Sequence, residues 1–89
     1  MSNSPKLNPL YRLQFEKAQN CYVLLYPEGM VKLSDSASEV LTLVDGSTSD
    51  GDIVKALQQK FPDAADLIEA DVKEFLVDAL EKGWIKYDR

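Results

Sequence analysis

The 89-residue sequence predicts an α+β fold in which a three-stranded antiparallel β-meander is followed by three helices. Three observations support this order of elements. Between residues 11 and 33, short apolar or alternating runs are separated by polar and Pro/Gly turns, as in successive strands. After residue 34, apolar residues recur at helical spacing. Each helical stretch is then followed by a residue that ends helices, in turn Gly46, Pro62 and Gly83.

The three strands differ in their apolar pattern. Residues 11–16 alternate apolar and polar side chains, which is typical of a half-buried strand. Residues 21–26 (CYVLLY) form a continuous apolar run, as expected of a central strand covered on both faces. Pro27 and Gly29 suit a three-residue hairpin loop with Gly29 in the left-handed conformation. Residues 30–33 (MVKL) are then a short third strand, which a meander places at a sheet edge.

Each helical stretch opens on a capping-box pattern, a Ser or Asp followed three residues later by an acidic residue. The pairs are Ser36 with Glu39 (with Ser34 as an alternative cap), Ser49 with Asp52, and Asp66 with Glu69. The side chains of the first two helices that are expected to face the core are Val40, Leu41, Val44, Ile53, Val54, Leu57 and Phe61.

The predicted domain spans residues 11–89. Residues 1–10 contain two prolines, two asparagines and two serines, and we expect them to form a flexible N-terminal segment. This segment lacks the apolar region of a signal peptide, and no run approaches the roughly 18 apolar residues of a membrane span. With Cys21 as the one cysteine, no internal disulfide is expected, and the sequence favours a cytoplasmic location.

The composition gives little support to catalysis or metal binding. Histidine, the commonest general base and metal ligand, is absent. Cys21 lies in the apolar central strand, where an inert thiol is expected. Asp50 and Asp52 flank Gly51, but the twelve-residue calcium-loop pattern is missing. We therefore expect no enzyme activity, no catalytic residue, no metal and no cofactor.

The charge argues against a nucleic-acid binder. The net charge is −5, whereas a nucleic-acid-binding domain needs a basic surface that neutralises phosphates. A winged-helix nucleic-acid-binding domain remains an alternative, although the second helix offers only Lys55 and Lys60, beside Asp50 and Asp52.

The third helix carries more apolar surface than one small core requires. Its apolar arc extends on one flank to Val77, with Lys73 between Val77 and Leu80, whereas the other flank is acidic. One interpretation is that Val77 is a single exposed apolar residue, or packs on Trp84 or Ile85. The other is that Leu76, Val77 and Leu80 form one wall of a groove.

This helix and the edge strand together predict a peptide-binding site. An edge strand leaves backbone N–H and C=O groups unpaired, so an extended peptide can add to it as a fourth strand. If Val31 points its N–H to such a peptide, a proline there would abolish binding. The candidate peptide-binding residues are Met30, Val31, Lys32, Leu33, Lys73, Leu76, Val77 and Leu80.

The ordered set YPEGMVKL, SDSASEVLTLVDG, DIVKALQQKF and DVKEFLVDALEKGWI resembles the PqqD family of pyrroloquinoline quinone biosynthesis, over about residues 11–87. The resemblance implies a winged helix-turn-helix-like domain that acts as a peptide chaperone, or precursor-peptide recognition element. It implies strand addition of the precursor peptide between the third strand and the third helix. It also implies a radical SAM enzyme as partner, which joins a glutamate and a tyrosine of that peptide.

Two further surfaces remain open at the level of sequence. Asp71, Glu74 and Asp78 on the third helix, together with the C-terminal tail, are candidates for contact with the partner enzyme, and a plain solvated acidic face is the alternative. The exposed edge of the third strand also allows a homodimer, so a homodimerisation domain is a further alternative function.

Overall fold

The predicted meander forms one antiparallel sheet in the order β2-β3-β4. The computed structural model describes residues 4–87, in which these strands are β2 (Arg12–Glu16), β3 (Cys21–Tyr26) and β4 (Gly29–Lys32). β3 is central, as predicted. The β3–β4 loop differs from the prediction, because Tyr26 pairs with Gly29 and leaves a two-residue loop of Pro27 and Glu28.

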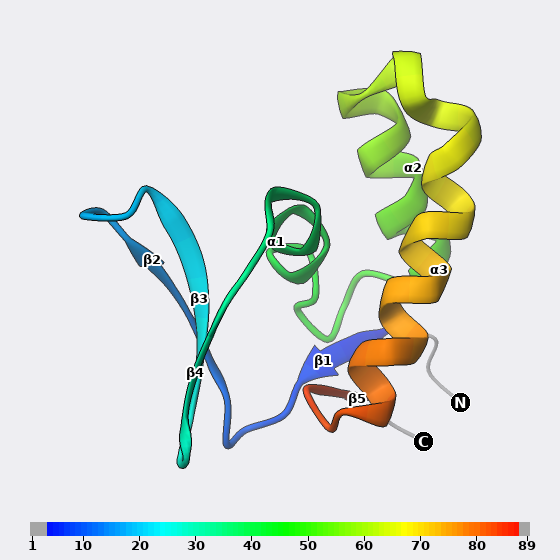
Figure 1. Ribbon diagram of the computed structural model, residues 1–89. Coiled ribbons are helices and arrows are strands. Elements are labelled where there is room, and N and C mark those ends of the chain that lie inside the picture. Colours follow the sequence, from blue (N-terminus) through cyan, green and yellow to red (C-terminus); the bar gives the residue numbers. More distant parts are fainter. Residues whose placement is uncertain (1–3, 88–89) are drawn as a thin grey trace.

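Three helices follow the sheet, also as predicted. They are α1 (Asp35–Leu41), α2 (Asp50–Lys60) and α3 (Ala65–Glu81), with a 3₁₀ turn, η1 (Pro62–Ala64), leading into α3. In Figure 1, α1 lies between the sheet and the pair formed by α2 and α3. Among residues 4–87, the helices are too short or too polar to cross a bilayer.

The helix starts confirm one capping prediction and correct two. Ser49 caps α2, where its side chain accepts a hydrogen bond from the Asp52 N–H. Ser34, the alternative, caps α1 instead of Ser36. The predicted cap at Asp66 is wrong, since α3 has no side-chain cap and the chain is already helical there. Pro62 starts η1 one turn earlier, and its fixed φ suits the first position of a helical turn.

A second, two-stranded sheet joins the ends of the described chain. β1 (Pro5–Leu7) pairs antiparallel with β5 (Ile85–Tyr87), and Figure 1 shows the pair beside the C-terminal turns of α3. The Pro5 carbonyl also accepts from the Gly46 N–H at 2.9 Å. Part of the segment expected to be flexible is therefore a strand, because Pro5 is fully buried and its neighbours find backbone partners. Residues 1–3 of that segment lie outside the described residues.

One apolar core connects the helices to the inner face of the sheet. Its members are Leu24, Leu33, Val40, Leu41, Val44, Ile53, Val54, Leu57, Val72, Leu76, Ala79 and Ile85. The core positions predicted for α1 and α2 are therefore confirmed, except Phe61, which is 40% exposed. Val23 is also buried, but on the opposite face of β3, between Gln14 and Lys32 in register.

Candidate functional site

The outer edge of β4 is the first part of the candidate site. Within residues 4–87, β4 pairs with β3 and with no other strand. The Leu33 N–H donates to the Tyr22 carbonyl at 3.0 Å, which fixes the phase of the ladder. Because antiparallel strands alternate the direction of their backbone groups, Val31 and Leu33 bond toward β3, whereas Met30 and Lys32 direct their N–H and C=O groups outward.

This direction of the backbone groups changes which residue should be replaced by proline to test strand addition. A proline at Val31 would remove a hydrogen bond within the sheet, so it would damage the fold before it affected any partner. The outward groups belong to Met30 and Lys32. Both side chains are exposed, and Met30 is 56% accessible. The open edge is thus short, and its hydrogen-bonding groups face solvent.

A groove of about 290 Å³ runs beside this edge. On one side it is bounded by Val31, Lys32, Leu33, Ser34 and Ala37, from β4 and the start of α1. On the other side it is bounded by Phe75, Asp78, Ala79, Lys82 and Trp84, from the second half of α3 and the turn that follows. An extended chain beside β4 would therefore have backbone groups on one side and, on the other, a helical wall that combines apolar side chains with Asp78 and Lys82.

The helical wall of this groove is held by contacts among its own residues. The rings of Phe75 and Trp84 have their centroids 6.5 Å apart at 58°. The Lys82 Nζ lies 5.1 Å from the centre of the Trp84 ring, a cation–π geometry. Gly83 has a φ of +79°, a conformation that glycine adopts without strain, and this turn brings Trp84 back toward Phe75.

The structure brings only part of the predicted site together. Val31, Lys32 and Leu33 line the groove, and Met30 lies on the same edge. The four predicted residues of α3 lie elsewhere: Leu76 is buried in the core, and Val77 and Leu80 are exposed outside the groove lining, 57% and 46% accessible. Lys73 is also outside it. Its Nζ bonds Glu69 Oε2 at 2.9 Å, which lowers the pKa of Glu69 and raises that of Lys73.

The side of α3 that faces β4 is instead the flank the sequence analysis described as acidic. The groove residues that were missed there are Phe75, Ala79 and Lys82, together with Trp84 beyond the helix. A helical wheel gives the positions of the side chains of one helix relative to one another. It does not say against which flank of the helix a strand from a distant part of the sequence packs. The sequence GWI at the end of the helix was the one signal in the sequence that could have indicated a role for Trp84.

Comparison with known proteins shows to which protein family the chain belongs. Residues 21–85 match the model of the PqqD family, described as coenzyme PQQ synthesis protein D. The chain belongs to the PqqD family. The matched region runs from β3 to the start of β5, so it includes both walls of the groove. The match to the PqqD family therefore covers β4 and all of α3.

Individual relatives agree with this membership. The chain is 54% identical to a PqqA binding protein of Azotobacter vinelandii, over 97% of this chain and 92% of that protein. It is 45% identical to a PqqA binding protein of Rahnella aquatilis, over 94% and 87% of the two chains.

A solved structure is also similar. It is the solution NMR structure of the PqqD truncation of Methylobacterium extorquens PqqCD, which is described as a stand-alone RiPP recognition element. The TM-score is 0.76 at 35% sequence identity, with 97% of this chain and 94% of that chain covered. The similarity therefore extends to β1 and β5 as well as to the meander and helices.

Proposed function

We propose that this protein is a peptide chaperone of pyrroloquinoline quinone biosynthesis that binds the PqqA precursor peptide. Membership of the PqqD family supports this, as do relatives named PqqA binding proteins and a structural neighbour described as a recognition element. The role we propose is binding rather than catalysis, and the names of the relatives, PqqA binding proteins, support it.

The peptide binds by strand addition to β4. The observation that carries this proposal is the outward direction of the Met30 and Lys32 backbone groups beside the groove. Main-chain hydrogen bonds to those groups supply affinity, and side chains of the peptide that alternate toward α3 supply selectivity. The peptide contacts are then Met30, Val31, Lys32 and Leu33 on the strand, with Phe75, Asp78 and Lys82 on the helix.

The bound peptide is presented to a radical SAM enzyme. A domain that holds a leader segment and also contacts the enzyme raises the local concentration of the reacting residues. The gain in rate comes from proximity, with no group of this chain taking part in the chemistry.

A proline at Lys32 tests the strand addition. Lys32→Pro removes an N–H that points away from β3, so the domain should fold while PqqA binding falls at least about tenfold, the equivalent of one lost hydrogen bond of ~1.4 kcal/mol. Lys32→Ala, which keeps the N–H, is the matched control for loss of the lysine side chain. Isothermal titration of PqqA into the three proteins makes the comparison.

Equal weakening by Lys32→Pro and Lys32→Ala would contradict strand addition. The open edge also suits pairing with a second copy of this chain, so light scattering with and without PqqA belongs to the same experiment. A dimer that does not bind PqqA would favour homodimerisation over peptide binding.

A further inference from the structure

A second, larger hollow adjoins the groove at β4. It has a volume of about 820 Å³ and is bounded by α1, by α3 from Ile68 to Asp78, by the end of α2 and by the tip of the β2–β3 hairpin. Ala37, Phe75 and Asp78 line both spaces, so the two lie side by side. Because β4 runs toward the start of α1, the hollow lies beyond the Leu33 end of the strand.

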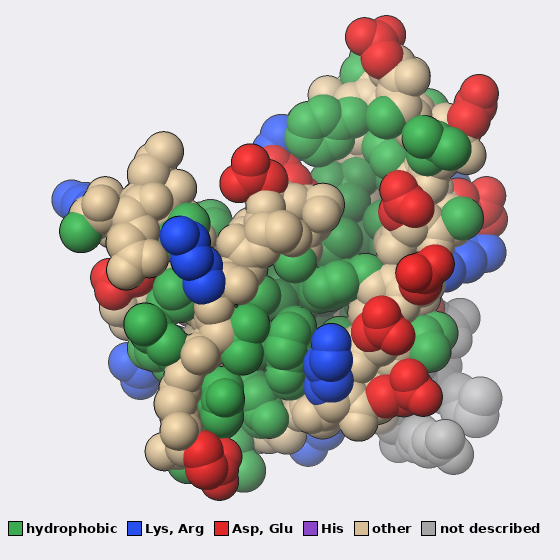
Figure 2. Space-filling model, viewed as in Figure 1, with side chains coloured by type: hydrophobic (Ala, Val, Ile, Leu, Met, Phe, Trp, Pro, Cys, Tyr) green, Lys and Arg blue, Asp and Glu red, His purple; other side chains and the backbone are tan. Residues whose placement is uncertain are grey.

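The floor of this hollow is apolar. Core side chains reach it from α1, α2 and α3, and Figure 2 shows hydrophobic side chains gathered between α1 and α3. Aromatic residues of the hairpin and of the end of α2 also line it. Phe15 and Tyr22 meet edge to face at 5.1 Å on the hairpin, and Phe61 is 40% exposed at the end of α2. The floor is therefore large enough for a bulky apolar side chain of a partner.

The rim of the hollow is acidic. Figure 2 shows acidic side chains in a row along the exposed flank of α3, and the members of the row that line the hollow are Asp71, Glu74 and Asp78. Asp35 of α1 also lines the hollow. No Lys or Arg lines the hollow among the described residues.

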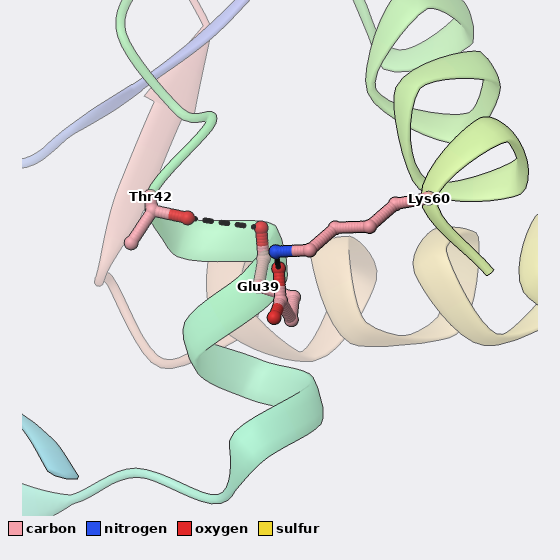
Figure 3. A network of polar contacts seen from close by, with 3 residues as sticks. All are labelled: Glu39, Thr42 and Lys60. Carbon is pink, nitrogen blue, oxygen red and sulfur yellow. Dashed lines mark hydrogen bonds and ion pairs between the residues drawn. The ribbon is translucent and has the colours of Figure 1, made fainter. Parts of the chain in front are cut away.

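One acidic residue of the rim already has a cation. The Glu39 carboxylate binds the Lys60 Nζ at 2.7 Å, and this ion pair ties α1 to the end of α2 (Figure 3). The backbone carbonyl of Glu39 also accepts a hydrogen bond from the Thr42 hydroxyl. The side-chain carboxylates of Asp71, Glu74 and Asp78 form no ion pair or hydrogen bond with the described residues. They are spaced three and four residues apart, at which like charges destabilise a helix. A cation bound along this row would relieve that repulsion.

We propose that the hollow binds a second part of the same precursor peptide, a segment in which a large apolar residue is flanked by Lys or Arg. The apolar side chain covers the floor, and the basic side chains pair with the α3 row Asp71, Glu74 and Asp78. This inference rests on the proposed function. The segment adjoins the residues that pair with β4, on the side that lies next to Leu33 and Ser34. Electrostatic pairing there fixes the register of the added strand, which a short edge specifies weakly.

Neutralising the α3 row tests this site. The triple variant Asp71→Asn, Glu74→Gln, Asp78→Asn should bind PqqA about tenfold more weakly than wild type in 50 mM NaCl, the sum of a few exposed ion pairs. The difference should shrink in 500 mM NaCl, because salt screens exposed pairs. The matched control is Asp52→Asn, Asp63→Asn, Glu81→Gln, which changes net charge equally at exposed sites outside the hollow. It should bind as wild type does.

Peptide variants complete the test. Replacing the Lys and Arg residues of PqqA by Gln one at a time should identify at least one whose loss makes binding insensitive to the triple variant. If wild-type protein binds PqqA and the triple variant binds equally well, this inference is overturned and the proposed function stands. Equal weakening by the control triple also overturns it, since net charge alone would then account for the effect. If wild-type protein does not bind PqqA at all, the proposed function fails as well.

Discussion

Tyr87 links the C-terminal strand to the start of α2. Its hydroxyl donates to both carboxylate oxygens of Asp50, at 3.0 and 3.2 Å. Burial raises the pKa of Tyr87 to about 12, and the hydrogen bond to Asp50 and the charge of that carboxylate add to the shift. A single hydroxyl thus fixes β5 against a helix that lies far from it in the sequence.

Removing this hydroxyl should have a pH-dependent effect on stability. We expect Tyr87→Phe to lower the free energy of unfolding by about 1 kcal/mol at pH 7. The folded pKa lies above the ordinary value of about 10, so the contribution is complete below pH ~10 and is lost as pH rises through about 12. Urea unfolding of both proteins between pH 7 and 12 measures the difference. A difference that stays constant to pH 12 would contradict this role.

The strands and helices could be predicted from the sequence more completely than the way in which they pack against one another. The alternation of residues 11–16, the apolar run of β3 and the caps at Ser34 and Ser49 are local signals, and each produced the expected element. The choice between the two flanks of α3 depends on contacts with β4, some forty residues earlier in the chain. No local pattern carries that information, so the sequence analysis chose Val77 and Leu80 where the structure presents Phe75 and Asp78 to the groove.

The two flanks of α3 make a direct comparison possible. Val77 and Asp78 are adjacent and exposed, but they point about 100° apart around the helix. We expect Asp78→Lys to weaken PqqA binding at least about tenfold, because it places a long cation in the groove. Val77→Lys should change the dissociation constant less than about twofold. Fluorescence anisotropy with labelled PqqA measures both.

The opposite result would restore the Val77 and Leu80 flank as the peptide site. A large fall in melting temperature for Val77→Lys would show instead that Val77 supports the fold. The exposed position of Val77 leads us to expect a change of less than ~0.5 kcal/mol in the free energy of unfolding.

At the scale of the whole molecule, the two ends of the described chain close the fold. β1 and β5 pair with each other, and the Asn8 side chain donates to the Gly83 carbonyl at 2.8 Å. This pairing joins residues almost the full length of the chain apart, and the Pro- and Asn-rich composition of the first ten residues concealed it. Because β5 follows Trp84 directly, the same pairing supports the helical wall of the groove.

Two leucines of the N-terminal segment test this closure. Leu7 packs against the core, whereas Leu10 is 67% exposed. Leu7→Asp should lower the free energy of unfolding by about 2 kcal/mol or more, since it places a charge against apolar side chains. Leu10→Asp should change it by less than ~0.5 kcal/mol. Thermal unfolding of both variants measures the two changes, and equal small effects would mean that the pairing of β1 with β5 contributes little to stability.

The whole-molecule account depends on an open strand edge beside a helical wall, where a guest peptide completes the sheet. Amide hydrogen exchange at β4, measured with and without PqqA, tests this most directly. We expect Val31 and Leu33 to be protected in both states, because they bond to β3, and Met30 and Lys32 to exchange fast in the free protein and slowly in the complex. Unchanged fast exchange at Met30 and Lys32 in a saturated complex would contradict strand addition at this edge.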